Sequence, residues 1–273
     1  MTERSGPFSG RVALFGSGET GKDGRLVQER LLARHPKPVR IAILETPAGF
    51  QPNVDAVTSK LRGFYEHNLQ NLRPIVTVVP ARARGGPYDP DDSAIAGLLD
   101  EADAIVAGPG SPTYVVRQLA GTATLASVRR RLTSGSTAVF ASAAAIAFGH
   151  LALPVYEIFK VGDDPRWTPG LDLLGELGLR LAVVPHWNNH EGGNDLDTSR
   201  CFIGQRRFRE LLEQLPQDVV ILGIDEHTAV VLDPAAGEAT VQGADTATTI
   251  SGGEVVTHSS GTTFPLTALS GRE

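Results

Sequence analysis

The sequence predicts an α/β fold in which a mostly parallel sheet is covered by helices on both faces. Short apolar runs alternate with amphipathic, helix-like stretches up to Asp225. Gly and Pro follow several of the apolar runs, as they do where a strand ends in a turn. Strands with wholly apolar cores that alternate with helices are typical of parallel sheets buried on both faces. After Asp225 the helix-like stretches stop, and only short β-like runs follow.

The predicted elements can be given in chain order. Strands are expected at residues 12–15, 39–44, 75–79, 104–107, 137–141, 181–184 and 219–223. Helices are expected at residues 26–34, 54–69, 93–100, 114–119, 125–132, 143–148 and 202–215. Turns such as Ser-Gly-Gly separate the β-like runs at 229–232, 239–242, 246–250 and 254–258. We therefore expect one α/β domain over 1–273, with a core at 10–227 and a small C-terminal β appendage at 228–268.

Composition and charge narrow the possible partners. Of the 273 residues, 41% are hydrophobic and 21% charged, and the net charge is −6, which disfavours nucleic acid as a partner. The uncharged run at 132–156 is long enough to span a bilayer, but it is mostly Ala, Ser, Thr and Gly, so we expect no membrane segment. A single cysteine, Cys201, excludes an intrachain disulfide, and residues 1–7 contain no apolar signal-peptide core. We expect a cytoplasmic protein.

Ser142 lies where the strand predicted at 137–141 gives way to an Ala-rich helix. A serine on a sharp strand-to-helix turn forms a nucleophile elbow, in which the turn exposes Oγ and the helix N-terminus stabilises negative charge. Such a turn needs small neighbours, which Ala141, Ala143 and Ala144 provide, whereas Phe140 is large. The alternative is a buried helix start for which Ser142 is the N-cap.

Several polar clusters fall where predicted strands end, which is where open α/β sheets place their ligands. They are residues 16–20, residues 108–111, Ser142 and His186. Residues 16–20 lack the dinucleotide-binding pattern, and the chain has no Gly-Lys-Ser/Thr, so we expect no phosphate site and no cofactor. His190 is four residues after His186, but the Pro- and Gly-rich surroundings oppose a helix that would align them, so no metal site is expected.

A serine nucleophile needs a base and an orienting acid. His186 directly follows a predicted strand, so we expect it at the same sheet edge as Ser142. For the acid the sequence favours Glu157, because a carboxylate within an apolar run needs a partner. Asp163 and Asp164 are second choices. The alternative for Glu157 is a strand residue that points to solvent.

Four segments resemble the cyanophycinase and aspartyl dipeptidase family of serine peptidases. The elbow is Phe140-Ala-Ser-Ala-Ala-Ala145, and the loop after an earlier strand is Gly108-Pro-Gly-Ser111. The histidine segment is Pro185-His-Trp-Asn-Asn189, and the late motif is Gly223-Ile-Asp-Glu-His-Thr-Ala229. The resemblance covers residues 10–250. It implies the class I glutamine amidotransferase-like fold, a flavodoxin-like three-layer α/β/α arrangement.

The same resemblance implies a serine peptidase that acts on small acidic, aspartyl-type peptides or amides. Backbone N–H groups of Ala143 and Gly110 would hold the oxyanion. Arg200 and Arg207 would bind the substrate carboxylate, since arginine presents a planar fork of donors, or they are solvated helix residues instead. The further substrate-binding residues expected are Ser111, Glu19, Asn188 and Asn189.

The chain departs from the family at the elbow, where both glycines are replaced, by Phe140 and Ala144. It therefore resembles a divergent branch, and two interpretations stay open. One is an active serine hydrolase, and the other is a catalytically silent protein that binds a small acidic ligand in the same pocket. A glutamine amidotransferase is disfavoured, because the only cysteine, Cys201, lies outside the elbow. We expect a homodimer from the general frequency of homodimers alone.

Overall fold

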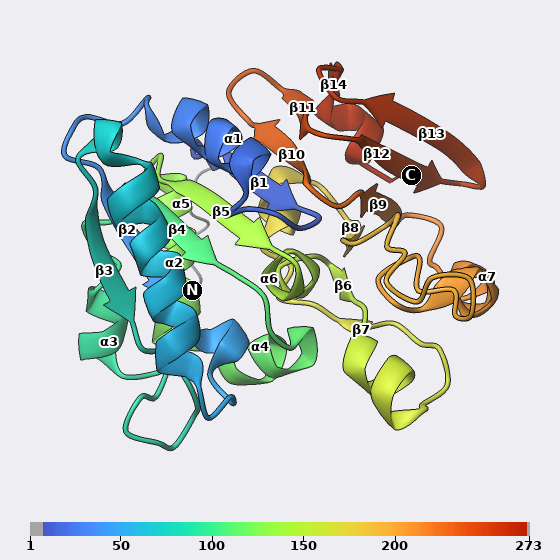
Figure 1. Ribbon diagram of the computed structural model, residues 1–273, viewed down its shortest axis with the longest axis horizontal. Coiled ribbons are helices and arrows are strands. Elements are labelled where there is room, and N and C mark those ends of the chain that lie inside the picture. The colour runs from blue at the N-terminus through green and yellow to red at the C-terminus, as the bar shows by residue number, and fades with distance from the viewer. Residues whose placement is uncertain (1–7, 272–273) are drawn as a thin grey trace, which may run out of the picture.

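The computed structural model describes residues 8–271 and shows a mixed α/β fold with two sheets (Figure 1). Residues 1–7, on which the expectation of no signal peptide rests, lie outside the described residues. Between residues 8 and 271, no helix combines the length and apolar character needed to cross a bilayer.

The larger sheet has eight strands. In spatial order they are β14 (Thr263–Pro265), β11 (Glu238–Gly243), β10 (Thr228–Asp233), β1 (Val12–Phe15), β5 (Thr137–Ala141), β4 (Ala104–Ala107), β2 (Arg40–Leu44) and β3 (Ile75–Val79). Five neighbouring strands of this sheet, β1, β5, β4, β2 and β3, are parallel to one another. Strands β10, β11 and β14 pair antiparallel.

The smaller sheet has six strands. In spatial order they are β13 (Glu254–Ser259), β12 (Thr246–Ser251), β9 (Val220–Ile224), β8 (Leu181–Val184), β6 (Leu151–Ala152) and β7 (Thr168–Pro169). Strands β9, β8 and β6 are parallel, whereas β12, β13 and β7 pair antiparallel.

The expected mostly parallel sheet is therefore found as two mixed sheets. Short turns join β10 to β11 and β12 to β13, and a short turn can only join antiparallel neighbours. These late strands divide between the sheets: β10 pairs with β1 of the larger sheet, and β12 pairs with β9 of the smaller one. Residues 228–268 thus take part in both sheets.

Helices cover both faces of the larger sheet. They are α1 (Lys22–Leu32), α2 (Val54–Asn68), α3 (Ser93–Gly97), α4 (Pro112–Leu119), α5 (Ala123–Thr133) and α6 (Ala143–Ala147), whereas α7 (Gly204–Glu213) packs against β8 and β9 of the smaller sheet. Ala13 and Phe15 of β1 pack into the core that α1 and α2 complete, while Val12 and Leu14 pack into the opposite core with α5. Successive strand side chains point to opposite faces, so a strand buried on both faces is apolar throughout.

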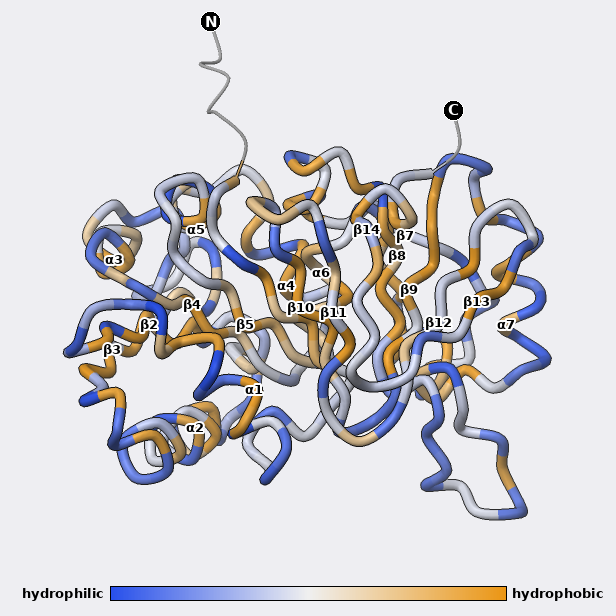
Figure 2. The backbone as a smooth tube through the Cα atoms, turned by 90° about the horizontal axis from the view of Figure 1, so that it is seen from above, coloured by the Kyte–Doolittle hydropathy of each residue, from blue (hydrophilic) through white to orange (hydrophobic). Residues whose placement is uncertain are grey.

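The two sheets meet at a seam formed by α6, β8, β9 and β10. Helix α6 continues from β5 of the larger sheet and packs on β8 of the smaller one, and β10 contacts β9. These elements run through the middle of the molecule as hydrophobic stretches (Figure 2). Because β5, β8 and β9 all lead to this seam, the residues that follow them are brought close together.

Candidate active site

Ser142 occupies a sharp turn between β5 and α6. Strand β5 ends at Ala141 and α6 begins at Ala143, and Ser142 between them has φ 52° and ψ −115°. A positive φ in a residue with a Cβ is strained by about 1–3 kcal/mol and persists only where the surrounding structure enforces it. Ser142 occupies the N-cap position of α6, but within residues 8–271 its side chain makes no capping hydrogen bond to the helix, so Oγ is not used as a cap.

The large residue before the turn does not disturb it. Phe140 is fully buried, and its ring stacks on that of Phe148 with 4.1 Å between centroids. Both rings belong to the core beneath α6, and neither lines the cavity in front of Ser142. The missing elbow glycines are therefore accommodated by packing, with Ala144 fully buried at the second position.

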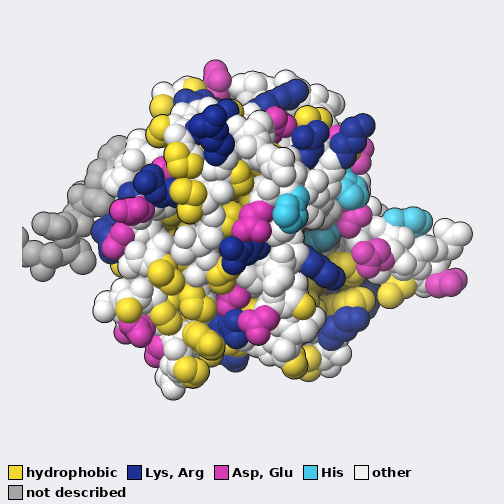
Figure 3. Space-filling model, turned by 60° about the vertical axis from the view of Figure 1, so that its left-hand side comes forward, with side chains coloured by type: hydrophobic (Ala, Val, Ile, Leu, Met, Phe, Trp, Pro, Cys, Tyr) yellow, Lys and Arg dark blue, Asp and Glu magenta, His cyan; other side chains and the backbone are white. Residues whose placement is uncertain are grey.

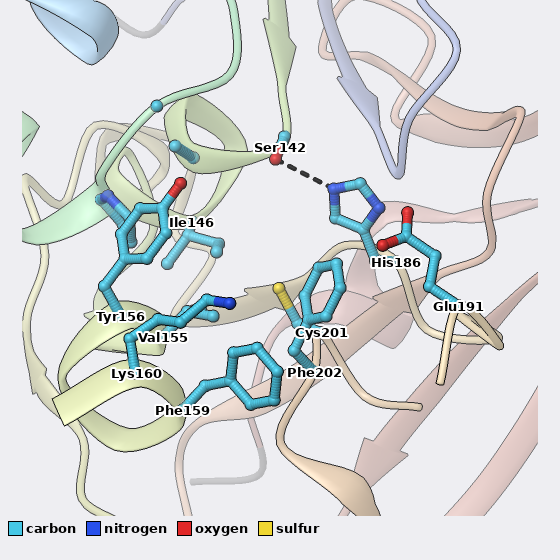
Figure 4. A pocket seen from close by; sticks show the side chains of 13 residues that line it. Ser142, Ile146, Val155, Tyr156, Phe159, Lys160, His186, Glu191, Cys201 and Phe202 are labelled. Carbon is cyan, nitrogen blue, oxygen red and sulfur yellow. Dashed lines mark hydrogen bonds between the residues drawn. The ribbon is translucent and has the colours of Figure 1, made fainter. Parts of the chain in front are cut away.

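His186 lies within hydrogen-bond distance of Ser142. The Oγ of Ser142 is 3.0 Å from Nε2 of His186 (Figure 4). His186 follows β8 of the smaller sheet, so the two residues come from different sheets and meet across the seam, not at one sheet edge as expected. The end of β1 supports both residues, because Phe15 accepts a backbone hydrogen bond from Ser142 and Gly16 accepts one from His186.

The carboxylate that contacts His186 is that of Glu226. Its Oε1 lies 3.0 Å from Nδ1 of His186 and also accepts a hydrogen bond of 3.0 Å from the Asn189 amide. Burial alone would raise the pKa of Glu226, but the hydrogen bonds from His186 and Asn189 outweigh it, so the pKa is lowered. An ionised carboxylate only accepts, which places the proton on Nδ1 and leaves Nε2 free to accept from Ser142.

Glu157 lies elsewhere, which corrects the sequence-based choice of acid. Its Oε1 accepts a hydrogen bond of 2.6 Å from the Thr113 hydroxyl, and it begins a π-helical turn, Glu157–Val161, where a strand residue was the alternative. Asp163 pairs with Arg166 at 2.9 Å. Glu226 could have been found by the argument used for His186, because it too follows a predicted strand.

A cavity of about 270 Å³ opens in front of Ser142 and His186. Both residues expected to hold an oxyanion, Ala143 and Gly110, are part of its lining. Gly110 has φ 156°, and an added Cβ would collide with the carbonyl oxygen of Pro47, so only glycine fits at this position. The backbone at the elbow and the Gly-rich loop before α4 thus lie on the same cavity.

Polar and charged groups on the cavity differ from those expected. The sequence-based expectations did not include Tyr156, Lys160 or Glu191, which all contribute to its lining. Arg200 and Arg207 do not belong to the lining. Arg200 stacks over the Trp187 ring at 3.9 Å, donates to the Trp187 carbonyl oxygen, and faces a different cavity.

The remaining expected substrate-binding residues mostly support the site from outside the cavity. Asn189 donates to Glu226, and Asn188 accepts a hydrogen bond of 2.8 Å from the Glu226 backbone. Ser111 caps α4 through Tyr114. Burial raises the pKa of Glu19, although its own backbone N–H and nearby His186 partly offset this effect.

Cys201 also lines the cavity but is not suited to be a nucleophile. It is 3% exposed, and burial raises the pKa of its thiol far above the ordinary range, so the thiolate is not populated.

Three consecutive residues, Arg200 to Phe202, have φ between 56° and 66°, and the backbone N–H of Cys201 donates to the His186 carbonyl oxygen. This left-handed run holds His186 and delays the start of α7 to Gly204, where the sequence predicted a helix from residue 202. In the described part of the chain, no three His, Cys, Asp or Glu residues are grouped to hold a metal ion.

Comparison with known proteins shows what the chain resembles as a whole. No family model and no curated protein matches the sequence. The crystal structure of a peptidase from an acI-B1 Actinobacterium is similar with a TM-score of 0.74 at 21% identity, over 96% of this chain and 98% of that one. The “Putative Peptidase E Protein from Listeria monocytogenes EGD-e” is similar with a TM-score of 0.52 at 15% identity, over 92% of this chain and 98% of that one. At these identities the likeness establishes the fold alone, so the chain shares, over nearly its whole length, the fold of solved proteins named as peptidases.

Proposed function

We propose that this protein is a serine hydrolase of the peptidase type in which Ser142, His186 and Glu226 act together. The observation that carries this proposal is a chain of two hydrogen bonds, from Ser142 Oγ to His186 Nε2 and from His186 Nδ1 to Glu226 Oε1, each 3.0 Å long. A strained serine beside a correctly protonated histidine is the arrangement that activates a hydroxyl for attack on a carbonyl carbon.

The proposed reaction begins when Ser142 Oγ attacks the scissile carbonyl and His186 Nε2 takes the hydroxyl proton. Backbone N–H groups of Ala143 and Gly110 would stabilise the negative oxygen of the tetrahedral intermediate. His186 then gives the proton to the leaving amine, which departs and leaves an acyl group on Ser142. Water, deprotonated by His186, releases the acid and restores the serine. Glu226 stabilises the imidazolium without taking its proton.

The proposed substrate is a small peptide or amide that carries negative charge. The cavity volume of about 270 Å³ lies near the lower limit of ordinary ligand pockets, of about 300 Å³. The net charge of the whole protein is −6, but a lysine, Lys160, lies on the cavity, and it is the natural partner for an acidic group there. A catalytically silent binding protein is the competing proposal, and the following experiment separates the two.

Reaction with a fluorophosphonate probe tests the proposed nucleophile. We expect purified protein to form a covalent adduct that peptide mapping locates on Ser142. Ser142→Ala should abolish labelling, and His186→Ala should slow it by about 100-fold or more, because general-base catalysis contributes about that much.

Cys201→Ser serves as the matched control, since Cys201 lines the same cavity but takes no part in the proposed chemistry. Its labelling rate should equal that of the wild type. Wild-type protein that stays unlabelled while remaining folded would overturn the hydrolase proposal and leave the binding protein.

A further inference from the structure

The segment from Val155 to Val161 places an unusual set of side chains on the active-site cavity. Tyr156, Phe159 and Lys160 all contribute to the lining, although they span only five residues. The chain here forms a π-helical turn, Glu157–Val161, instead of an α-helical one. π-Helical turns are rare in proteins, and many of those that do occur lie at functional sites. This turn therefore supplies the aromatic and cationic side chains on the cavity wall opposite His186.

Lys160 is a cation without an anionic partner. Its Nζ lies 4.6 Å from the centroid of the Phe159 ring, and it forms no ion pair with any residue that the structure describes. In Figure 4 its amino group reaches into the cavity, and the Tyr156 hydroxyl points toward Ser142. The carboxylate of Glu191 lies on the other side of the cavity, beside His186. An ammonium that faces a cavity without a partner favours an anionic ligand.

Apart from the Tyr156 hydroxyl, the lining between Lys160 and Ser142 is mostly apolar and aromatic. The Phe159 and Phe202 rings lie 5.5 Å apart, and the Phe202 ring lies 5.8 Å from the His186 ring. Val155 and Ile146, which are 8% and 1% exposed, complete this wall. A ligand that reaches from Ser142 to Lys160 must therefore pass along rings and aliphatic side chains.

We propose that the cavity selects an amide or peptide with an aromatic or large apolar body and one carboxylate, and that Lys160 binds this carboxylate. The proposal rests on the hydrolase function above and narrows its substrate class. Beside the scissile carbonyl the cavity lining presents the Phe202 ring and the Glu191 carboxylate, and its lysine, Lys160, is already taken, so a second carboxylate there, as in an aspartyl residue, would have no lysine or arginine partner. Burying an ion there without a partner is unfavourable, so an aspartyl group is disfavoured.

Product-like acids test the selection without any need for turnover. We would measure by calorimetry the Kd of 3-phenylpropanoate, of 3-phenylpropanamide and of succinate for the wild type, Lys160→Met, Lys160→Arg and Lys60→Met. The wild type should bind the phenyl carboxylate about tenfold more tightly than the phenyl amide, equivalent to about 1.4 kcal/mol. Lys160→Met should lose this preference, and Lys160→Arg should keep most of it.

Lys60→Met is the matched control, because Lys60 is exposed on α2 and does not line the cavity. It should behave as the wild type. An equal carboxylate preference in the wild type and Lys160→Met would overturn the proposal. Tighter binding of succinate than of 3-phenylpropanoate would overturn it too, as would the absence of saturable binding of 3-phenylpropanoate.

Fluorophosphonate labelling of the same preparations separates this proposal from the hydrolase function. If Ser142 is labelled but the protein does not prefer the carboxylate to the amide, only the assignment of Lys160 as the carboxylate-binding residue is wrong. Absence of labelling together with a carboxylate preference that depends on Lys160 would defeat only the catalytic proposal. Because Lys160 is exposed, its replacement should change the free energy of unfolding by no more than about 0.5 kcal/mol, so loss of preference cannot be ascribed to unfolding.

Discussion

Glu226 and Glu157 are two glutamates with different partners, and this difference gives a sharp test. Glu226 accepts from His186 and Asn189, whereas Glu157 accepts from Thr113. We expect Glu226→Gln to slow fluorophosphonate labelling by about 100-fold, because an amide no longer stabilises the imidazolium or fixes the proton on Nδ1. The measurement is the pseudo-first-order labelling rate at pH 7.

Glu157→Gln is the control for this comparison. It should leave the labelling rate unchanged, since the Thr113 hydroxyl can still donate to the amide oxygen. Equal rates for both variants, or a slower rate for Glu157→Gln alone, would contradict the assignment of Glu226 as the orienting acid.

The residues of the site differ in how far sequence can predict them. Ser142 and His186 each follow a strand with a clear apolar pattern, so local sequence is enough to place them at strand ends. The acid was a harder choice, because candidates follow the strands on both sides of β8: Glu157 comes after β6, and Glu226 comes after β9. The π-helical turn then directs Glu157 toward Thr113, and no simple periodicity predicts such a turn.

At the scale of elements, the β5–α6 turn imposes strain on Ser142 alone. We expect Ser142→Gly to be more stable than Ser142→Ala by about 1 kcal/mol, because glycine adopts φ near 52° without the penalty of a Cβ. Urea unfolding of both variants measures the difference in the free energy of unfolding. Equal stabilities would show that the turn stores no strain.

Element boundaries were predicted well where the hydrophobic pattern is strong and poorly where backbone conformation decides. The strands at 12–15, 104–107, 137–141 and 181–184 have the predicted limits. The helix predicted from residue 202 starts at Gly204, because Arg200 to Phe202 adopt left-handed conformations that no β-branched or glycine pattern indicates. The helix predicted to reach Asp100 ends at Gly97.

At the scale of the molecule, the C-terminal strands belong to both sheets. We expect a chain that ends at residue 227 not to fold, because β1 would lose β10 and β9 would lose β12, exposing the backbone of two apolar strands. Far-UV circular dichroism and limited proteolysis of the truncated chain measure this. A folded, protease-resistant product would show that residues 228–268 are a separable appendage.

The distribution of charged and hydrophobic side chains over the surface of the molecule concerns its possible binding partners. Acidic and basic side chains are interspersed on the face shown in Figure 3, and hydrophobic side chains gather in its lower part. A homodimer, a cytoplasmic location and the exclusion of nucleic acid stay predictions, based on the frequency of homodimers, the single cysteine and the net charge of −6.

The seam between the sheets makes the proposed chemistry sensitive to mechanical displacement. The proposed nucleophile, Ser142, follows β5 of the larger sheet, and the proposed base, His186, follows β8 of the smaller one, while Glu226 lies in the link between β9 and β10. A misplacement of 1 Å between reacting groups can lower a rate by about 100-fold. A slide of one sheet past the other by that amount would break a contact of 3.0 Å while leaving both sheets folded. Under pressure or mild denaturant, the labelling rate of Ser142 would then fall at conditions where both sheets are still folded. The fall would measure how far the two sheets move relative to each other before unfolding begins.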